Sequence, residues 1–465
     1  MIEYKSVSFC GIGGSGMSAI AQVLAASQIN VCGTDRNFDM GNCLDMQKKL
    51  EAQNIKIFKQ DGTFLQNKPE VLVVSTAVET TIPDVKTAVE NNIPVIKRAE
   101  LLAKMFNGKK GVAIGGTSGK STVTGMVGFL LKDAGMDPTI INGGIMENFR
   151  TETSIGNAHS GKSEFMVIEA DESDGTIELY NPYAAILTNI SLDHKPLWQL
   201  RNLFQDFCNR TKGPLIINLD CPEIMNLMKD LKSKNLRAFS CTNESADYFA
   251  DDIVLRPNES TFYTDGVKFT LPVPGMHNIA NALAAIGLCS ELGVSTTTLA
   301  RSFLKFQGIG RRLQTIGSHN GIIVFDDFGH NPEKIEATIT TLQKHLSENE
   351  RLLIMYQPHG FAPTRMLKDG YIKTFSNKLR NQDILLLPEI FYAGGTVTKD
   401  ISSNDLVEAI KSNNKQALFF QNRIEIKEWL LANCRVGDRI VVMGARDDTL
   451  TDYAKEIFEG IKKTN

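Results

Sequence analysis

The chain has 465 residues, of which 42% are hydrophobic and 22% are charged, and its formal net charge is −3. This length exceeds what one hydrophobic core usually supports, so it predicts two to four domains. Because the net charge is small, it provides no global attraction for nucleic acid or an anionic membrane, and any anionic ligand must be held by local positive groups.

The first block, to about residue 108, alternates short apolar runs with helical patterns, which predicts a parallel βαβ sheet. The predicted strands are residues 7–10, 31–33, 55–58 and 71–74. The loop at residues 11–16 has the G-x-G-x-x-G spacing, and Asp35 ends the next strand about twenty residues later. This arrangement predicts a dinucleotide or nucleotide-sugar phosphate at a helix N-terminus, and a tight turn with packing glycines is the alternative.

The second block opens with an apolar run at residues 111–114, a glycine-rich loop at 115–122 and a helical pattern at 123–133. In this arrangement backbone N–H groups and the positive end of the helix dipole face a phosphate. We expect Lys120 to reach the outer phosphate oxygens and Ser121 to place its hydroxyl on Mg²⁺. The first glycine comes one residue later than in a strict Walker A loop, so a glycine-rich turn without a ligand is the alternative.

Four acidic residues fall within residues 169–174, directly after the apolar run 165–168. The carboxyl ends of strands face the ligand crevice of a doubly wound sheet, and Mg²⁺ suits carboxylates grouped near nucleotide phosphates. A solvated acidic loop is the alternative. The next predicted strand, 184–187, is followed by Asp193 and His194, which we expect near the same edge, although a lone histidine is more often structural.

Later segments continue the alternation. Residues 241–272 are rich in β-branched and turn residues, which predicts a small antiparallel insertion. A third block starts near residue 313 and again predicts parallel strands. These strands are residues 322–325, 352–355, 384–387 and 439–442. Three α/β blocks in sequence predict ligand-binding clefts between domains.

The eight cysteines are scattered, with no C-x-x-C pair and no zinc spacing, which favours free thiols in a reducing compartment. The first residues lack the apolar core of a signal peptide, and no apolar stretch reaches the ~18 residues of a transmembrane helix. We therefore expect a soluble, cytoplasmic protein.

Several ordered motifs resemble the Mur ligase family. They are GTSGKST at 116–122, EADESD at 169–174, TNISLDH at 188–194, PGMHNIANALAA at 274–285, GIGRR at 308–312 and FDDFGHNP at 325–332. They extend over almost the whole chain. The loop at 11–16 and residues 97–102 are similar to the branch of the family that acts on UDP-N-acetylmuramate and adds L-alanine or a recycled murein tripeptide.

The resemblance implies three α/β domains: a UDP-sugar-binding Rossmann-like domain at 1–108, a central P-loop ATP-binding domain at 109–312 and a C-terminal Rossmann-like domain at 313–465. It implies an ATP- and Mg²⁺-dependent amide-bond ligase of peptidoglycan precursor synthesis. In such enzymes the ATP γ-phosphate activates the substrate carboxylate as an acyl phosphate, and the amine of an amino acid then displaces phosphate. The expected partners are UDP-N-acetylmuramate and an amino acid or peptide, without nucleic acid or membrane insertion.

The resemblance also implies roles for particular residues. The catalytic residues are Lys120, Glu169 and His194, and the metal ligands are Ser121, Glu169 and His194. The ATP-binding residues are Gly116, Thr117, Ser118, Gly119, Lys120, Ser121, Thr122, Asn278, Arg311 and Asp326, the last two reaching the nucleotide on domain closure. The UDP-sugar-binding residues are Gly11, Gly13, Gly14, Ser15, Gly16 and Asp35. The residues expected to bind the incoming amino-acid substrate are His330, His359 and Arg365.

Simpler alternatives exist for three of these residues. Asn278 stands at the start of an alanine-rich helical pattern and is also explained as a helix cap. Arg311 is also explained as half of a surface pair with Arg312. Asp326 is also explained as part of a helix-start signal before Pro332.

This chain departs from the family pattern in the segment from Tyr356 to Arg365. At the positions of Gly360 and Pro363, the alanine-adding members that this chain resembles typically carry arginines, which are available to the amino-acid carboxylate. Neither glycine nor proline can pair with a carboxylate. Arg365 is then expected to substitute, or the incoming amine is a different amino acid or a peptide. The alternatives are a tripeptide-recycling ligase, a ligase for another amino acid or UDP-sugar, and a non-catalytic nucleotide-binding paralogue.

Overall fold

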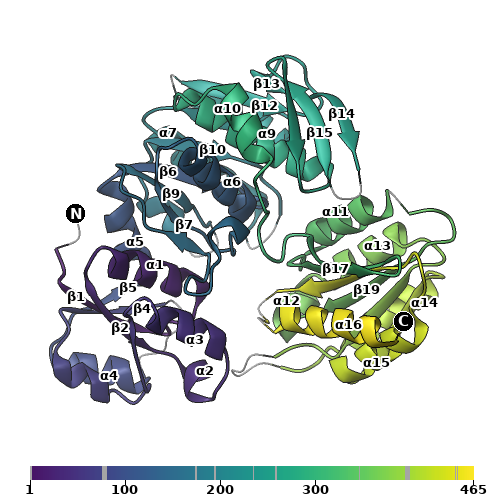
Figure 1. Ribbon diagram of the computed structural model, residues 1–465, viewed down its shortest axis with the longest axis horizontal. Helices are drawn as coiled ribbons and strands as arrows, with labels where there is room; N and C mark the ends of the chain where they lie inside the picture. Colours follow the sequence, from purple (N-terminus) through teal and green to yellow (C-terminus); the bar gives the residue numbers. More distant parts are fainter. Residues whose placement is uncertain are drawn as a thin grey trace. The chain divides into compact units, whose positions relative to one another are not determined.

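The computed structural model describes residues 3–75, 81–172, 175–192, 195–233, 235–256, 259–344, 346–392, 398–445, 447 and 449–464. The chain divides into two compact units, Met1–Ile309 and Gly310–Asn465. Both units are built from strands alternating with helices (Figure 1).

The first sheet of the first unit is parallel, with the strand order β3-β2-β1-β4-β5. Its strands are β1 (Ser6–Cys10), β2 (Asn30–Thr34), β3 (Lys56–Phe58), β4 (Val71–Val74) and β5 (Val95–Lys97), and the helices and turn between and after them are α1 (Ser15–Ala26), α2 (Arg36–Asp39), α3 (Leu44–Glu51), η1 (Thr63–Asn67), α4 (Pro83–Glu90) and α5 (Arg98–Asn107). Val7, Phe9 and Val73 are fully buried in one hydrophobic cluster, and Cys10 and Leu72 are fully buried in another, so both faces of the sheet are covered. The predicted βαβ sheet and its four predicted strands are confirmed.

The second sheet has the order β13-β12-β11-β10-β6-β9-β7-β8 and is parallel except at β8. Its strands are β6 (Lys110–Gly115), β7 (Thr139–Ile141), β8 (Ala158–His159), β9 (Phe165–Glu169), β10 (Ala184–Leu187), β11 (Leu215–Asn218), β12 (Leu236–Ser240) and β13 (Tyr248–Phe249). The predicted strands at 111–114, 165–168 and 184–187 are therefore confirmed. Because β6 lies between β9 and β10, the segments that follow these three strands meet at one edge.

Helices and a small sheet complete the first unit. They are α6 (Lys120–Asp133), η2 (Glu147–Phe149), η3 (Thr176–Leu179), α7 (Leu197–Arg210), α8 (Pro222–Leu227), η4 (Met228–Asp230), α9 (Met276–Glu291) and α10 (Thr296–Phe303), with strands β14 (Asp251–Leu255), β15 (Ser260–Thr264) and β16 (Val267–Leu271). The last three strands are antiparallel, which confirms the predicted insertion.

The second unit holds one sheet, with the order β17-β18-β22-β19-β20-β21. Its elements are β17 (Gln314–His319), β18 (Ile322–Asp327), α11 (Pro332–Gln343), β19 (Leu352–Gln357), α12 (Phe361–Met366), α13 (Lys368–Lys378), β20 (Ile384–Pro388), α14 (Ser403–Ser412), β21 (Gln416–Phe420), α15 (Arg423–Asn433), β22 (Arg439–Gly444) and α16 (Leu450–Thr464). The four predicted parallel strands are confirmed. The antiparallel β17 at the edge was not predicted.

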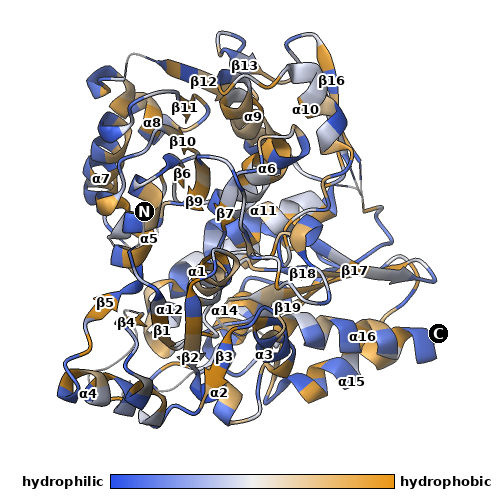
Figure 2. Ribbon diagram, turned by 60° about the vertical axis from the view of Figure 1, so that its left-hand side comes forward, coloured by the Kyte–Doolittle hydropathy of each residue, from blue (hydrophilic) through white to orange (hydrophobic). Residues whose placement is uncertain are grey.

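Helix α16 shows how sequence periodicity places a helix on this sheet. Its buried residues, Leu450, Ala454, Ile457 and Ile461, recur at helical spacing and pack in a core cluster with Val324 and Val442 of the sheet. In Figure 2 the same helix carries orange and blue segments, as expected for an amphipathic helix.

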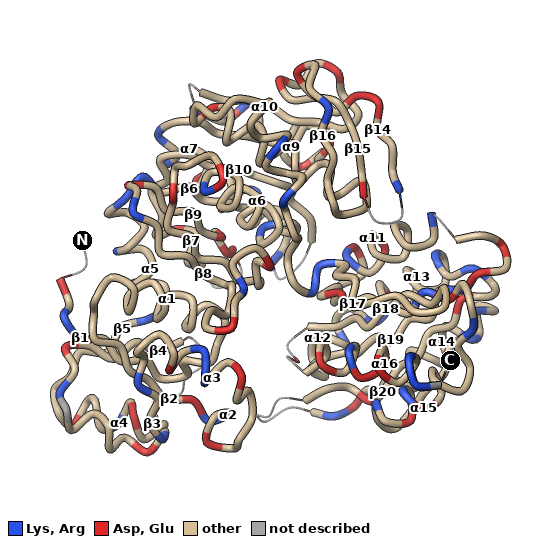
Figure 3. The backbone as a smooth tube through the Cα atoms, viewed as in Figure 1, with Lys and Arg blue, Asp and Glu red and all other residues tan. Residues whose placement is uncertain are grey.

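Lys and Arg as well as Asp and Glu residues are spread along both units (Figure 3). Among the described helices, none combines the length and apolarity that crossing a membrane requires.

Candidate active site

The glycine-rich loop runs from the end of β6 to the first turn of α6. Gly119 is the N-cap of α6 with φ of 86°, and Gly116 has φ of 130°, both in the region that favours glycine. An added Cβ would lie 2.6 Å from Asn281 Oδ1 at Gly119 and 2.1 Å from Thr188 Oγ1 at Gly116. The loop therefore packs at van der Waals distance from its neighbours, at the positive end of the α6 dipole.

Residues after β10 hold this loop in shape. Asn189 Oδ1 accepts a hydrogen bond from the backbone N–H of Ser118 at 2.9 Å, and its Nδ2 donates to the Ser118 carbonyl at 3.0 Å. The Thr188 hydroxyl donates to the same carbonyl at 2.7 Å. The sequence placed Thr188 and Asn189 in the family-like segment 188–194 but assigned neither residue a role.

Lys120, the first residue of α6, is surrounded by acidic side chains. Its Nζ donates to the Gly116 carbonyl at 2.7 Å and forms an ion pair of 2.7 Å with Glu172 Oε2. Burial alone would lower the pKa of Lys120, but the charges of Glu172, Asp171 and Glu169 outweigh burial and raise it. Lys120 is therefore a charged ammonium, and Glu172, with its side chain 3% exposed, is a site residue that sequence reasoning did not single out.

Glu169 ends β9, and it pairs in register with Ile114 at the end of β6. Its Oε1 accepts a hydrogen bond from the Gly143 N–H at 3.2 Å. On the neighbouring segment, Asn142 Nδ2 donates to the Ser121 carbonyl at 3.0 Å. The carboxylate of Glu169 and the start of α6 are thus held beside one another, because adjacent parallel strands end at the same edge.

A cavity of about 300 Å³ lies within the first unit, between the glycine-rich loop that follows β1 and the acidic segment that follows β9. It is lined by Gly14, Ser15 and Gly16 from the loop after β1, and by Glu169 and Asp171 from the segment after β9. Two motifs that the sequence indicated separately therefore share one cavity.

Arg98 is a further residue of this cavity that sequence reasoning missed. It is the first residue of α5, and a Cβ added at Gly16 would lie 2.9 Å from its Nη1. A guanidinium beside a glycine-rich loop matches an anionic ligand in geometry and charge. The only sequence signal was its place within the family-like segment 97–102.

Asp35 and Gly11 belong to the frame of the first loop. Asp35 is 6% exposed, and its two carboxylate oxygens accept hydrogen bonds from the backbone N–H groups of Gly13 and Asn37, each at 2.9 Å. It thereby caps α2 and holds the loop at once. Gly11 has φ of 82°, and its N–H donates to the Thr34 carbonyl at 2.8 Å.

Asn278 lies in the first turn of α9, and its Nδ2 donates to the Pro274 carbonyl at 2.7 Å. The N-cap of α9 is Gly275, so the helix-cap alternative for Asn278 is wrong. Asn281, less than one turn further on, is the residue that faces Gly119 of the phosphate loop.

Arg311 and Asp326 form a buried pair in the second unit. The guanidinium donates to the Gly444 carbonyl at 2.6 Å and to the Asp447 carbonyl at 3.3 Å, and lies 3.5 Å from Asp326 Oδ1. Asp326 also accepts from the Thr451 hydroxyl at 2.5 Å. Because the Arg311 side chain is only 13% exposed, the surface-pair alternative for this residue is wrong. Asp326 lies at the end of β18 and does not start a helix, since Asn331 caps α11.

The three residues assigned to the amino acid separate into two groups. The rings of His330 and His359 lie 5.7 Å apart between centroids. Arg365, on α12, instead forms an ion pair with Asp400 and donates to the Thr398 carbonyl at 3.2 Å. The guanidinium that was expected to substitute for the missing arginines therefore has a carboxylate partner inside the protein.

The burial of His330 leads us to predict that the free energy of unfolding depends on pH. Desolvation of its ring, with the nearby charge of Lys334, lowers the pKa of His330 well below its ordinary value of 6.5. Below about pH 6.5 the unfolded chain therefore binds a proton that the folded chain excludes, so the free energy of unfolding falls by up to about 1.4 kcal/mol per pH unit. Urea unfolding at pH 7.5, 6.5 and 5.5 is expected to show a shallower decline in His330→Gln. Equal declines in both proteins would contradict this assignment.

Asp193 and His194 lie outside the described residues, so the proposed position of His194 remains a prediction. Within the described residues, His, Cys, Asp and Glu side chains form no group of three that could hold a metal ion alone. Magnesium ions at phosphate sites need fewer protein ligands, because one or two carboxylates act together with substrate phosphates and water.

The fold and this site together define a multidomain α/β protein whose glycine-rich loop connects a buried strand to a helix N-terminus, as in proteins that bind nucleotide phosphates. Family models match three consecutive segments: residues 6–110 (Mur ligase family, catalytic domain), 114–289 (Mur ligase middle domain) and 311–446 (Mur ligase, glutamate ligase domain). The chain belongs to the Mur ligase family and is an ATP-dependent ligase.

Similar proteins match this chain over nearly its whole length. The chain is 33% identical over 459 residues to the UDP-N-acetylmuramate–L-alanine ligase of Dictyoglomus turgidum, covering 96% of this chain and 95% of that protein. It is 33% identical over 455 residues to the enzyme of the same name from Geobacter sp. strain M21, covering 95% of each. Its fold matches the UDP-N-acetylmuramate–alanine ligase of Thermotoga maritima with a TM-score of 0.80 at 23% identity, covering 99% of this chain and 100% of that chain. It also matches a murein peptide ligase of Psychrobacter arcticus with a TM-score of 0.70 at 22% identity, covering 98% of each.

Proposed function

We propose that the protein joins L-alanine, or a related amino acid, to UDP-N-acetylmuramate, with conversion of ATP to ADP and phosphate. The observation that carries this proposal is the shared cavity, which is lined by the loop of Gly14–Gly16 and the acidic segment at Glu169. Asn142, which also lines it, donates a hydrogen bond to the carbonyl of Ser121 in the P-loop. An activated carboxylate must form where a sugar nucleotide and an ATP γ-phosphate meet. The names of the full-length relatives support the same reaction.

We propose domain boundaries at residues 108 and 312 for this reaction. Residues 1–108 would bind the UDP-sugar, 109–312 would bind ATP, and 313–465 would form the C-terminal domain. The first boundary falls between α5 and β6, and the second falls just before β17.

Charge and position supply the chemistry, without a protein nucleophile. The Lys120 ammonium and the backbone N–H groups of Gly116–Thr122 would hold the β- and γ-phosphates. Arg98 and the loop from Gly11 to Gly16, framed by Asp35, would hold the anionic part of the UDP-sugar. Asn278 would contact the adenine, and Arg311 and Asp326 would contact the nucleotide.

Two bond exchanges complete the reaction. In the first, a carboxylate oxygen of the UDP-sugar bonds to the γ-phosphorus as the bond to ADP breaks, which gives an acyl phosphate. In the second, the amine nitrogen bonds to the acyl carbon, loses a proton, and expels phosphate from a tetrahedral intermediate. The amide bond forms in this second exchange.

The residues present at the P-loop fit Mg²⁺. The hydroxyl of Ser121 and the carboxylate of Glu169 are hard oxygen donors, and Glu169 lines the cavity next to Asp171. We propose Ser121, Glu169 and His194 as its protein ligands. When bound, Mg²⁺ supplies positive charge between the phosphates and the carboxylates.

We propose that the incoming amino acid lies beside His330 and His359 in the C-terminal domain. A cytoplasmic location is part of the proposal, because all eight cysteines are free thiols.

The test is phosphate release from Mg-ATP with UDP-N-acetylmuramate and one amine at a time: L-alanine, glycine or L-serine. We expect release with L-alanine only when all three substrates are present, with the amide product identified by mass spectrometry. ATP binding without turnover for any amine or UDP-sugar would instead identify a non-catalytic paralogue.

A further inference from the structure

A buried amide, that of Asn157, lies where α1 of the first sheet contacts β7 and β8 of the second (Figure 1). Asn157 directly precedes β8 and is 2% exposed. Its Nδ2 donates to the Ser15 carbonyl at 2.8 Å and to the Ser18 hydroxyl at 3.0 Å, and its Oδ1 accepts from Gln22 Nε2 at 2.8 Å. Because the Ser15 carbonyl can only accept, these bonds fix the amide in one orientation.

The backbone of Asn157 continues these hydrogen bonds toward the P-loop. Its carbonyl accepts from the Asn142 N–H at 2.9 Å. Asn142 is buried as well, and its Nδ2 donates to the Ser121 carbonyl at 3.0 Å. A continuous path of hydrogen bonds therefore runs from Ser15, the first residue of α1, through Asn157 and Asn142 to Ser121, in the first turn of α6.

The two ends of this path belong to the two loops that would hold the substrates. Ser15 and Asn142 both line the cavity of about 300 Å³, and Ser121 belongs to the P-loop. For a carboxylate oxygen to attack the γ-phosphorus, the two bound substrates must meet within about 3.5 Å, and a misplacement of about 1 Å costs about a hundredfold in rate. A fixed distance between the two loops is therefore a requirement of the reaction itself.

The same network extends outward from Asn157 to Gln53, which follows α3. Gln53 Nε2 donates to Gln22 Oε1 at 3.0 Å and to the Thr153 carbonyl at 2.8 Å. Gln53 is partly exposed, whereas Gln22 is buried. Gln53 thus belongs to the network but lies off the path from Ser15 to Ser121, so it separates the effect of the path from that of the network as a whole.

We propose that Asn157 is a positioning residue that couples the loop at residues 11–16 to the P-loop. Its amide holds the start of α1, and its backbone holds Asn142 against the start of α6. A nucleotide bound at the P-loop therefore also restrains the loop after β1. The inference rests on the proposed function, because it assigns these two loops to the two substrates. Asn157 acts through Ser15 and Asn142, which line the cavity.

The kinetic experiment measures phosphate release from Mg-ATP with UDP-N-acetylmuramate and L-alanine. Asn157→Ala is expected to lower kcat about thirtyfold, with the KM for ATP and for UDP-N-acetylmuramate within about threefold, because each loop keeps its own ligand contacts. Asn142→Ala breaks the same path at its other end. We expect the double variant to lose no more activity than the weaker single variant, because a path that is broken once carries no coupling.

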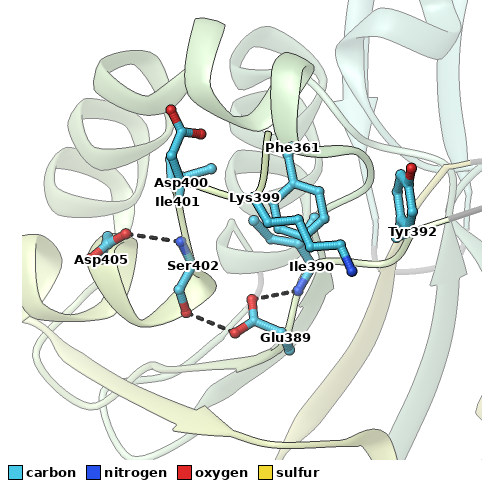
Figure 4. Close-up of a pocket in the computed structure, with 9 residues that line it drawn as sticks. All are labelled: Phe361, Glu389, Ile390, Tyr392, Lys399, Asp400, Ile401, Ser402 and Asp405. Carbon is cyan, nitrogen blue, oxygen red and sulfur yellow. Dashed lines mark hydrogen bonds between the residues drawn. The ribbon is translucent and has the colours of Figure 1, made fainter. Parts of the chain in front are cut away.

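Two variants control for loss of stability alone. Gln53→Ala removes the outer bonds of the network, and its kcat should stay within about twofold of the parent value. Figure 4 shows a polar contact of the second unit, in which the Ser402 hydroxyl donates to Glu389 at 2.8 Å. Ser402 also caps α14, so Ser402→Ala lowers stability and should leave kcat within the same limit.

Hydrogen–deuterium exchange of the full-length protein separates this inference from the proposed function, because it needs a bound nucleotide but no turnover. With Mg-ADP alone, we expect slower exchange at residues 116–122 and also at residues 11–18 in the parent protein. In Asn157→Ala the slowing should be confined to residues 116–122. Where Asn157→Ala does not fold, Asn142→Ala carries the same test.

Two results would overturn the inference: no slowing at residues 11–18 in the parent protein, or the same slowing in the parent and in Asn157→Ala. An unchanged kcat in Asn157→Ala would also overturn it and would leave the proposed function standing. If the parent protein released no phosphate with any amine, the ligase proposal alone would fail, and the exchange result would still decide the role of Asn157.

Discussion

Lys120→Ala is expected to lower kcat/KM for ATP by at least about a thousandfold in the phosphate-release assay. The ammonium lies at the N-terminus of α6, beside the loop that would hold the phosphates, and it offsets the carboxylates of Glu172, Asp171 and Glu169. Without it, three negative side chains would face the negative phosphates. Binding of UDP-N-acetylmuramate, measured by calorimetry, should persist, because its proposed site is the loop after β1.

Two variants control this prediction. Lys132→Ala removes a lysine from the other end of α6 and should leave ATP turnover within about twofold of the parent. Lys120→Ala/Glu172→Gln removes the buried carboxylate that loses its partner, and should recover stability but not activity. Equal loss of ATP turnover and UDP-sugar binding in Lys120→Ala would contradict the proposed division of labour between the first two domains.

Glu169→Gln is expected to lower kcat at least about a hundredfold and to raise the Mg²⁺ concentration needed for half-maximal activity. The substitution preserves the side-chain volume and replaces a negative oxygen by an amide, which is a weak magnesium ligand. The measurement is phosphate release as a function of Mg²⁺ concentration at fixed ATP.

The matched control is Glu164→Gln, immediately before the other end of the same strand. Glu164 is exposed and pairs with Lys110 at 2.6 Å, so its loss should leave the Mg²⁺ dependence unchanged. If Glu169→Gln lowered activity with no change in Mg²⁺ dependence, the carboxylate would be acting by position and not as a metal ligand.

The strands were predictable because buried parallel strands are short continuous apolar runs bounded by turns. Residues 111–114 and 165–168 have this form, and both lie in the centre of the second sheet. The edge strand β17, Gln314–His319, has mixed polar composition and was not predicted, because an edge strand is covered less completely than a central one.

The parts of the site that could be predicted are those whose functional residues lie close together in the sequence. The P-loop requires glycines, a lysine and a hydroxyl at fixed spacing, so Gly116, Gly119 and Lys120 could be singled out before their positions were known. The partners of these residues could not. Asn189 and Glu172 reach the loop only because β10 and β9 flank β6.

For Arg365 the sequence indicated a carboxylate-binding role, but only the fold revealed the carboxylate with which it is paired. Its spacing from the missing arginines made it the natural carboxylate-binding residue. The structure brings Asp400 against it, although the two lie 35 positions apart in the chain.

The sequence by itself determined the family, the order of the α/β segments and the identity of the phosphate loop, because each depends on residue types at short, regular spacing. Only the tertiary structure decided that the loop at Gly14–Gly16 shares a cavity with Glu169, that Arg98 joins them, and that Lys120 is held by Glu172. These are relations between distant segments. They arise from which strands lie next to one another, and strand order is set by packing of the whole sheet and not by any local pattern.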